Sequence, residues 1–186
     1  MRVHTKTKSN RGAEYHCARC RKVILPTTKY HEWSFRYGGT YRQHEECGYP
    51  KPSQLTQSKL SEVYAAQESF SVEGMDEPDD IASEMNEVAE AARSVAEEYR
   101  EAVSAMNMEG SGNESEERAD ALESYADEIE NVAGDIEGET FEVEEAEEGV
   151  EKVEGAEPKD EQGRTREEWL QELRDNATEA VNALDL

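Results

Sequence analysis

The stretch from residue 17 to residue 47 begins with Cys17-Ala18-Arg19-Cys20 and ends with His44-Glu45-Glu46-Cys47. In each motif two residues separate the potential ligands, so that one tight backbone turn can direct both side chains to a single metal ion. Three thiolates and one imidazole are typical of a closed tetrahedral Zn²⁺ site. The sequence therefore predicts a site for one zinc ion, with His16 or His31 as the alternatives to His44.

Four protein ligands leave a zinc ion no open coordination position, whereas a catalytic zinc ion normally keeps one. The sequence also holds no His-Asn-His nuclease constellation, no Gly-rich loop that would cradle a phosphate and no nucleophile elbow. We therefore expect a structural metal and a chain that is not an enzyme.

Residues 14–52 are expected to form a small zinc-ribbon-like or treble-clef-like β domain. Short strands should flank the first ligand pair, and aromatic and β-branched residues predict a second hairpin from residues 29–36 and 40–43. Because so small a domain buries little apolar surface, the metal should supply much of its folding free energy. Residues 1–13 are polar and basic and are predicted to be a flexible arm. The core beside the metal is expected to consist of Val23, Ile24, Leu25, Trp33 and Phe35.

The rest of the chain is expected to be mainly helical. Ser53 is the predicted N-cap of a connecting helix over residues 53–72. Apolar residues then recur at alternating intervals of four and three, which predicts an antiparallel coiled-coil hairpin over residues 76–137. The predicted seam consists of Ile81, Met85, Val88, Ala92, Val95, Tyr99, Ala102 and Met106, followed by Leu122, Tyr125, Ile129, Val132 and Ile136.

Two further segments follow this hairpin. Residues 138–163 are dominated by Glu, and the repulsion between these charges predicts an acidic disordered linker. The capping box Thr165-Arg166-Glu167-Glu168 opens a C-terminal amphipathic helix over residues 164–186. The fold class is thus α+β in several parts. The apolar stripe of the last helix should bury on the hairpin or on a partner, and it consists of Trp169, Leu173, Ala177, Ala180 and Leu184.

Charge is distributed unevenly along the chain. The formal net charge is −25, made up of +7 in residues 1–52, the basic head, and −32 in the remainder. A basic segment favours polyanionic partners, and aromatic side chains among the cations can stack on unpaired bases. The candidate nucleic-acid-binding residues are Arg19, Arg21, Lys22, Lys29, Arg36 and Arg42.

Other interpretations of the basic head stay open at this stage. The acidic part of the same chain can occupy the cations at high effective concentration. A protein–protein adaptor, or a structural or regulatory protein with a purely structural zinc site, is the alternative to nucleic-acid binding. The partner of such an adaptor would bind through the helical seam or the C-terminal helix. As a further alternative, carboxylates along the acidic helices could imitate the phosphates of DNA. The sequence does not decide the oligomeric state.

Cysteine spacing and targeting signals bear on location. The spacing of the three cysteines fits a metal site better than a disulfide framework. A metal site with free thiolates agrees with a reducing compartment. No run approaches the ~18 apolar residues of a membrane span, and the first residues lack the apolar core of a signal peptide. We expect a soluble cytoplasmic protein without a membrane partner. The many carboxylates and few lysines are also compatible with a halophilic source.

Several motifs together resemble a group of uncharacterised proteins encoded by tailed viruses of bacteria and archaea. The similar stretches are the two ligand pairs, Phe35-Arg36-Tyr37-Gly38-Gly39, residues 52–59 (PSQLTQSK) and residues 63–68 (VYAAQE), with a looser likeness over residues 95–102. This resemblance implies a zinc-ribbon-like head on an acidic helical body. It implies no activity. If it holds, the adaptor alternative becomes a structural or regulatory viral protein, and the expected location becomes the host cytoplasm.

Overall fold

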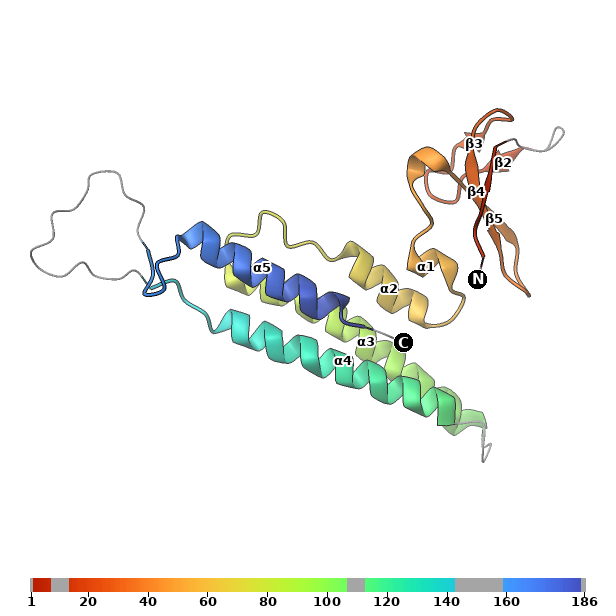
Figure 1. Ribbon diagram of the computed structural model, residues 1–186. Coiled ribbons are helices and arrows are strands. Elements are labelled where there is room, and N and C mark those ends of the chain that lie inside the picture. The colour runs from red at the N-terminus through yellow and green to blue at the C-terminus, as the bar shows by residue number, and fades with distance from the viewer. Residues whose placement is uncertain (1, 8–13, 107–112, 143–158, 185–186) are drawn as a thin grey trace, which may run out of the picture. The chain divides into compact units, whose positions relative to one another are not determined.

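The protein has the α+β architecture expected from the sequence. The structure, a computed structural model, describes residues 2–7, 14–106, 113–142 and 159–184. The chain divides into two compact units, residues 1–68 and residues 69–186. The named strands belong to the first unit and the three long helices to the second (Figure 1). None of the helices within the described ranges has the length and apolar character that crossing a membrane requires.

The first unit contains two small antiparallel sheets. Strands β2 (Tyr15–His16) and β3 (Val23–Ile24) pair around the first ligand motif. Strands β4 (Tyr30–Ser34) and β5 (Thr40–His44) form the second hairpin, in which Trp33 lies opposite Tyr41. Both predicted hairpins are therefore present.

The prediction of a flexible arm over residues 1–13 is wrong for its first part. Residues His4–Lys6 form strand β1, which pairs with β4 in a sheet of order β1-β4-β5. Without β1, the outer edge of β4 would present unpaired N–H and C=O groups, and an extended segment satisfies them. Lys6 adds an ion pair with Glu32, 3.9 Å from nitrogen to oxygen. Residues 8–13 lie outside the described residues.

The core beside the metal ligands also differs from the prediction. Val23 and Leu25 are 39% and 60% exposed, whereas Ile24, Tyr30 and Cys17 are buried together. Strand β4 is buried on both of its faces, so that alternate residues reach different neighbours. Tyr30 faces the ligand side.

The opposite face of β4 packs on the segment that follows the last cysteine. The Trp33 ring stacks on Tyr41 at 5.9 Å between centroids, and its Nε1 donates to the Gln54 carbonyl at 3.1 Å. Trp33 therefore belongs to this second packing layer and not to the core beside the ligands. Phe35 joins it through an edge contact with Tyr41 at 5.6 Å.

The connecting helix is interrupted. Helix α1 spans Pro52–Leu55 and helix α2 spans Leu60–Ser69. Between them the Thr56 hydroxyl accepts a hydrogen bond from the Ser58 backbone N–H at 3.2 Å, a local contact that competes with helical bonding. The prediction that Ser53 is the N-cap is wrong, because Lys51 is the N-cap of α1 and Ser53 lies inside the helix. The Ser53 hydroxyl instead donates to the Glu68 carboxylate at 2.6 Å.

The second unit is a bundle of three helices that lie side by side (Figure 1). Helix α3 spans Pro78–Met106 and helix α4 spans Asn113–Glu137. The two helices are antiparallel, because Arg93 pairs with Asp127 while Arg100, one heptad later, pairs with Asp120. The predicted seam residues that are buried are Ile81, Met85, Val88, Ala92, Val95, Tyr99, Leu122, Tyr125, Ile129 and Ile136.

The C-terminal helix buries its stripe on the hairpin of its own chain. Helix α5 spans Arg166–Asn182, and Thr165 and Glu168 form the predicted capping box. Tyr125 of α4 donates its hydroxyl hydrogen to the Val181 carbonyl of α5 at 2.5 Å. The buried side is rotated slightly from the prediction, since Val181 is buried and Ala180 is only half-buried.

The predicted acidic linker, residues 138–163, is ordered at its C-terminal end. Lys159 pairs with Thr165, and the buried Asp160 accepts hydrogen bonds from the backbone N–H groups of Gln162 and Arg164. A local side-chain cap therefore overrides charge repulsion at these positions. Residues 143–158 lie outside the described residues.

Candidate metal centre

The first ligand pair lies on the turn between β2 and β3. The backbone N–H of Cys17 donates to the Lys22 carbonyl at 2.9 Å, and that of Arg21 donates to the Cys17 carbonyl at 3.0 Å. Arg21 adopts a left-handed conformation, with φ of 63°, which closes this tight turn. The N–H of Ala18 also donates to the Arg42 carbonyl at 2.7 Å, and this bond fixes the turn to β5.

The second ligand pair is at the end of β5. His44 is the last residue of the strand, and Cys47 ends the 3₁₀ helix η1, Glu45–Cys47. Gly48 follows with φ of 82°, and its N–H donates to the Glu45 carbonyl at 2.9 Å. One turn of 3₁₀ helix thus returns Cys47 toward His44.

Gln43 supports this second turn and was not recognised from the sequence. Its side chain is fully buried, and Nε2 donates to the carbonyls of Cys47 at 3.3 Å and Gly48 at 3.1 Å. Its Oε1 accepts from Gln54 Nε2 at 3.2 Å. The only sequence signal is an amide side chain directly before a ligand, which is too common to be specific.

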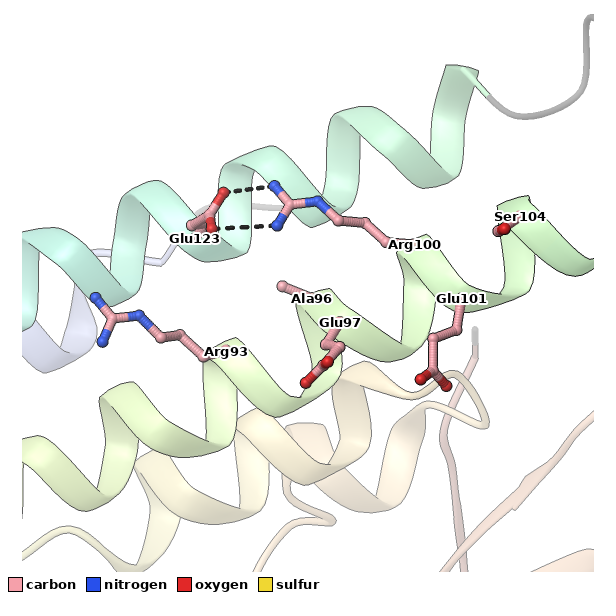
Figure 2. A pocket seen from close by; sticks show the side chains of 7 residues that line it. All are labelled: Arg93, Ala96, Glu97, Arg100, Glu101, Ser104 and Glu123. Carbon is pink, nitrogen blue, oxygen red and sulfur yellow. Dashed lines mark hydrogen bonds and ion pairs between the residues drawn. The ribbon is translucent and has the colours of Figure 1, made fainter.

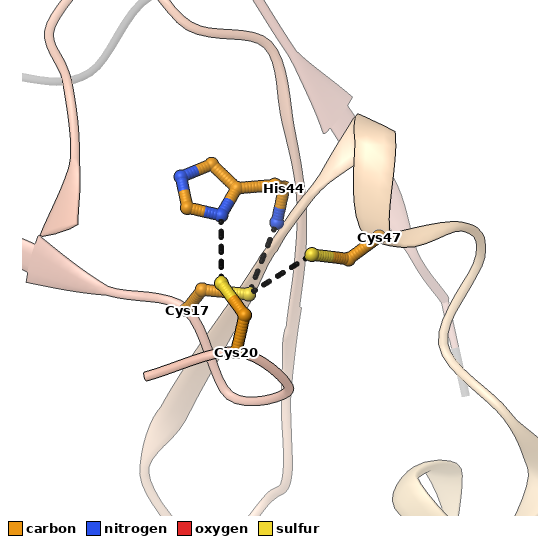
Figure 3. A group of neighbouring side chains, drawn as sticks. All are labelled: Cys17, Cys20, His44 and Cys47. Atoms are coloured by element: carbon orange, nitrogen blue, oxygen red, sulfur yellow. Dashed lines mark hydrogen bonds between the residues drawn. The ribbon is translucent and has the colours of Figure 1, made fainter. Parts of the chain in front are cut away.

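The four predicted ligands come together in space (Figure 3). Their ligand atoms all lie within 4.8 Å of one another. The Sγ atoms of Cys17 and Cys47 are 3.9 Å apart, and Cys20 Sγ is 3.4 Å from Nδ1 of His44. Tetrahedral zinc with thiolate and imidazole ligands places them about 3.3–3.8 Å apart, from bond lengths of ~2.0–2.3 Å. The group could therefore hold one metal ion.

The two alternative histidines are not in this group. His31 lies 3.3 Å from the Thr5 hydroxyl and makes an edge contact with the Tyr49 ring at 5.2 Å. His16 is exposed on β2. Among the residues that the structure describes, His44 is the histidine that joins the cysteines.

The thiols differ in their affinity for protons. Burial raises the pKa of Cys17, but hydrogen bonds with the backbone, first at Cys20 and next at His44, lower it to about 6. Burial and the neighbouring sulfur atoms raise the pKa of Cys47 to about 11. Thiolates this close to one another repel, and a bound divalent metal ion would offset that repulsion.

The candidate nucleic-acid-binding residues do not form one patch of free cations. Arg42 donates from Nε to Glu32 at 2.9 Å, and its guanidinium lies 3.6 Å from the centre of the Tyr15 ring. Lys29 pairs with Glu45 at 3.7 Å, and Arg19 donates to the Cys47 carbonyl. These three cations stabilise the domain itself.

The other three candidates are exposed. Arg21 and Lys22 follow each other on the turn after Cys20, and Arg36 lies 5.2 Å from the centre of the Tyr37 ring at the end of the β4–β5 hairpin. Within the described part of the chain, none of the three has an ion pair. A phosphate could reach all three of these candidate cations.

The second unit has an open hollow of about 520 Å³ beside α3 and α4 (Figure 2). Its arginines are occupied, since Arg100 pairs with Glu123 and Arg93 pairs with Asp127 and Glu130. The hollow is therefore part of the ion-paired contact between the two helices. Its remaining lining residues are Ala96, Glu97, Glu101 and Ser104.

Comparison of the chain with protein-family models, curated proteins and solved structures found no match. The resemblance to proteins of tailed viruses therefore stays a prediction.

Proposed function

We propose that the first unit is a zinc-stabilised binding module in which one Zn²⁺ is held by Cys17, Cys20, His44 and Cys47. The convergence of these four ligand atoms within 4.8 Å carries this proposal. Cysteine-rich sets with one histidine favour zinc over Mg²⁺ or Ca²⁺, which prefer oxygen ligands. Because all four positions of a tetrahedron are filled by protein, the ion has a structural role and the module is not an enzyme.

Replacing one ligand tests the zinc site. Cys20→Ser should bind zinc at least ten-fold more weakly than the wild type, which should carry one zinc per chain. The matched control is His16→Ala, which removes the neighbouring histidine outside the group and should leave zinc stoichiometry unchanged. Metal analysis of purified proteins measures both. Full occupancy in Cys20→Ser, or loss in His16→Ala, would refute the ligand set.

We further propose that the head binds single-stranded nucleic acid through Arg21, Lys22 and Arg36. These cations are exposed on two turns, and Tyr37 beside Arg36 is 87% exposed and able to stack on a base. Phosphate contacts of this kind position a strand without reading its sequence. The acidic second unit limits non-specific attraction, so binding should be weak and strongly salt-dependent.

A protein–protein adaptor is the second candidate. The engagement of Arg19, Lys29 and Arg42 with groups of their own domain favours it, because it leaves half of the candidate cations for phosphates. Val23 and Leu25 are also exposed on and beside β3, where an apolar partner surface could cover them. In this alternative the zinc ion is purely structural and the head binds protein.

A salt-dependent titration separates the two candidates. Full-length protein and a labelled oligonucleotide of ~20 nucleotides are titrated by fluorescence anisotropy at several salt concentrations. Removing three phosphate contacts in Arg21→Ala/Lys22→Ala/Arg36→Ala should reduce the slope of log K against log salt by roughly 2, at ~0.7 per contact for single strands. Affinity should fall about equally for all sequences.

The control for this titration removes the same charge elsewhere. The triple variant Arg118→Ala/Lys159→Ala/Arg166→Ala changes three cations of the second unit and should leave the salt slope unchanged. A flat titration of the wild type to high micromolar concentration, or equal losses in both triple variants, would favour the adaptor.

A further inference from the structure

A groove with apolar walls and acidic edges runs between α4 and α5. Its volume is about 450 Å³. Ile136 and Leu173 form its buried floor, and Val132 and Ala180 are half-buried along it. Its edges carry four exposed carboxylates and one amide, contributed by Glu128, Asp135, Glu139, Glu179 and Asn176. Among the described residues that line the groove there is no lysine or arginine.

Glu128 and Asp135 belong to α4, and the carboxylates at the groove differ from the acids on the other side of that helix. On the side toward α3, Asp120, Glu123, Asp127 and Glu130 are paired with Arg93 and Arg100. The four carboxylates at the groove have no ion pair with any residue that the structure describes. The acids of α4 on the side toward α3 are therefore neutralised within the chain, whereas the four carboxylates at the groove are not.

Charge identifies the kind of occupant. Residues 143–158, which connect α4 to α5, contain seven Glu and one Lys and would be repelled by the same edges. A second copy of the second unit carries the same acidic edges and would be repelled as well. A segment with Lys or Arg on one face and apolar side chains on the other complements both the edges and the floor.

We propose that the groove between α4 and α5 binds a cationic amphipathic helix of a partner protein. Apolar side chains of that helix lie over Val132, Ile136 and Leu173, and its lysines or arginines pair with Asp135, Glu139 and Glu179. The site is independent of the zinc module, and it would stand if the nucleic-acid proposal failed. It assigns the negative charge of the second unit a recognition role in addition to solvation.

A pair of peptides tests whether the groove or charge alone binds. The probe is a labelled 18-residue peptide of Leu and Lys arranged as an amphipathic helix, and its control is a scrambled isomer of equal charge without an apolar face. Titrated against the full chain at ~0.15 M salt, the amphipathic peptide should bind at least ten-fold more tightly. Equal affinities would show attraction to charge only and overturn the proposal.

Substitutions on the protein locate the binding. Asp135→Lys/Glu139→Lys should weaken the amphipathic peptide at least ten-fold, whereas Glu87→Lys/Glu90→Lys, with the same change in net charge on exposed positions of α3, should weaken it less than three-fold. Equal losses would overturn the proposal, because the groove would then be no different from other acidic surface.

A neutral substitution separates the groove from its edges. Ala180→Phe fills the groove without changing charge and should weaken binding of the amphipathic peptide at least ten-fold. Ala105→Phe, on the exposed surface of α3, is its control.

Sedimentation analysis and a linker replacement test the other two occupants. If the wild type is a dimer that Ala180→Phe dissociates, a second copy occupies the groove and the proposal is overturned. If replacing residues 143–158 by a Gly-Ser linker raises peptide affinity ten-fold, the chain's own segment occupies it.

Discussion

Asp160 shows how one side chain can order a segment whose composition predicts disorder. Its Oδ1 accepts from the backbone N–H groups of Gln162 and Arg164 at 3.0 and 2.7 Å, and its Oδ2 accepts from Arg164 Nε at 2.8 Å. Burial acts to raise the pKa of Asp160, but the hydrogen bonds and the charge of Arg164 together lower it. The turn therefore depends on the ionised carboxylate and places Thr165 to cap α5.

The sign of this pKa shift gives a pH-dependent prediction. A carboxyl whose pKa is lowered by folding contributes stability above its unfolded pKa of ~3.9, and this contribution is lost as pH falls through the lower folded pKa. Asp160→Asn should therefore lower the melting temperature of the second unit at pH 7, and the difference from wild type should shrink below about pH 4. Thermal unfolding followed by circular dichroism at both pH values measures it.

Glu161 provides the control for Asp160. It is exposed on the same turn, so Glu161→Gln should change the melting temperature little at either pH. A deficit in Asp160→Asn that is as large at pH 3 as at pH 7 would mean that shape, and not charge, holds the turn.

At the scale of helices and strands, local patterns predicted most of the buried residues of the long helices. The alternating apolar intervals of α3 and α4 marked most of their buried seam, with Ala102 and Val132 only half-buried, because a helix presents the same face every three to four residues. Thr165 and Glu168 predicted the start of α5, since both partners of a capping box lie within four residues.

Contacts between segments distant in sequence were not predictable in this way. Strand β1 pairs with β4 across 26 residues, and no local pattern marks His4–Lys6 as its partner. Tyr30 and Trp33 are both buried because different elements cover the two faces of β4, so the predicted core beside the metal contained Trp33 and omitted Tyr30. The break between α1 and α2 depends on hydroxyl contacts of Thr56 that compete with helical bonds.

The grouping of the four candidate metal ligands was predictable for a related reason. Each ligand pair is defined by a spacing of two residues, and only the pairing of the two motifs is long-range. The supporting contacts are different, because they depend on the register of the strands. Glu32 and Arg42 form an ion pair since they lie directly opposite each other on β4 and β5, and Gln43 is the next residue of β5. Opposite charges at opposed positions attract, so this ion pair follows once the register is known.

At the scale of the whole molecule, the two units differ in what stabilises them. The second unit buries an apolar seam along three helices, whereas the buried side chains beside the ligands of the first are Cys17, Ile24 and Tyr30. The first unit, residues 1–68, is so small that it buries little apolar surface, and its stability is therefore marginal. The proposed zinc ion, worth roughly 10–16 kcal/mol in zinc-finger peptides, would make the difference. Folding of the first unit should therefore depend on metal, and folding of the second should not.

Metal removal tests this division, and the position of the two tryptophans makes it measurable, since Trp33 is in the first unit and Trp169 in the second. In Trp169→Phe, Trp33 is the sole tryptophan. The Trp33 side chain is 2% exposed in the folded protein, so excess chelator should shift its emission to the red as the first unit unfolds. The helical ellipticity of the wild type at 222 nm should stay nearly constant. Added zinc should reverse the shift, because the ligands then refold around the ion.

The contradicting outcome is an unchanged Trp33 emission in protein that metal analysis shows to be metal-free. Hydrogen bonds such as those of Gln43 would then hold the first unit together without the ion. A parallel loss of ellipticity would mean that the helices also depend on the metal.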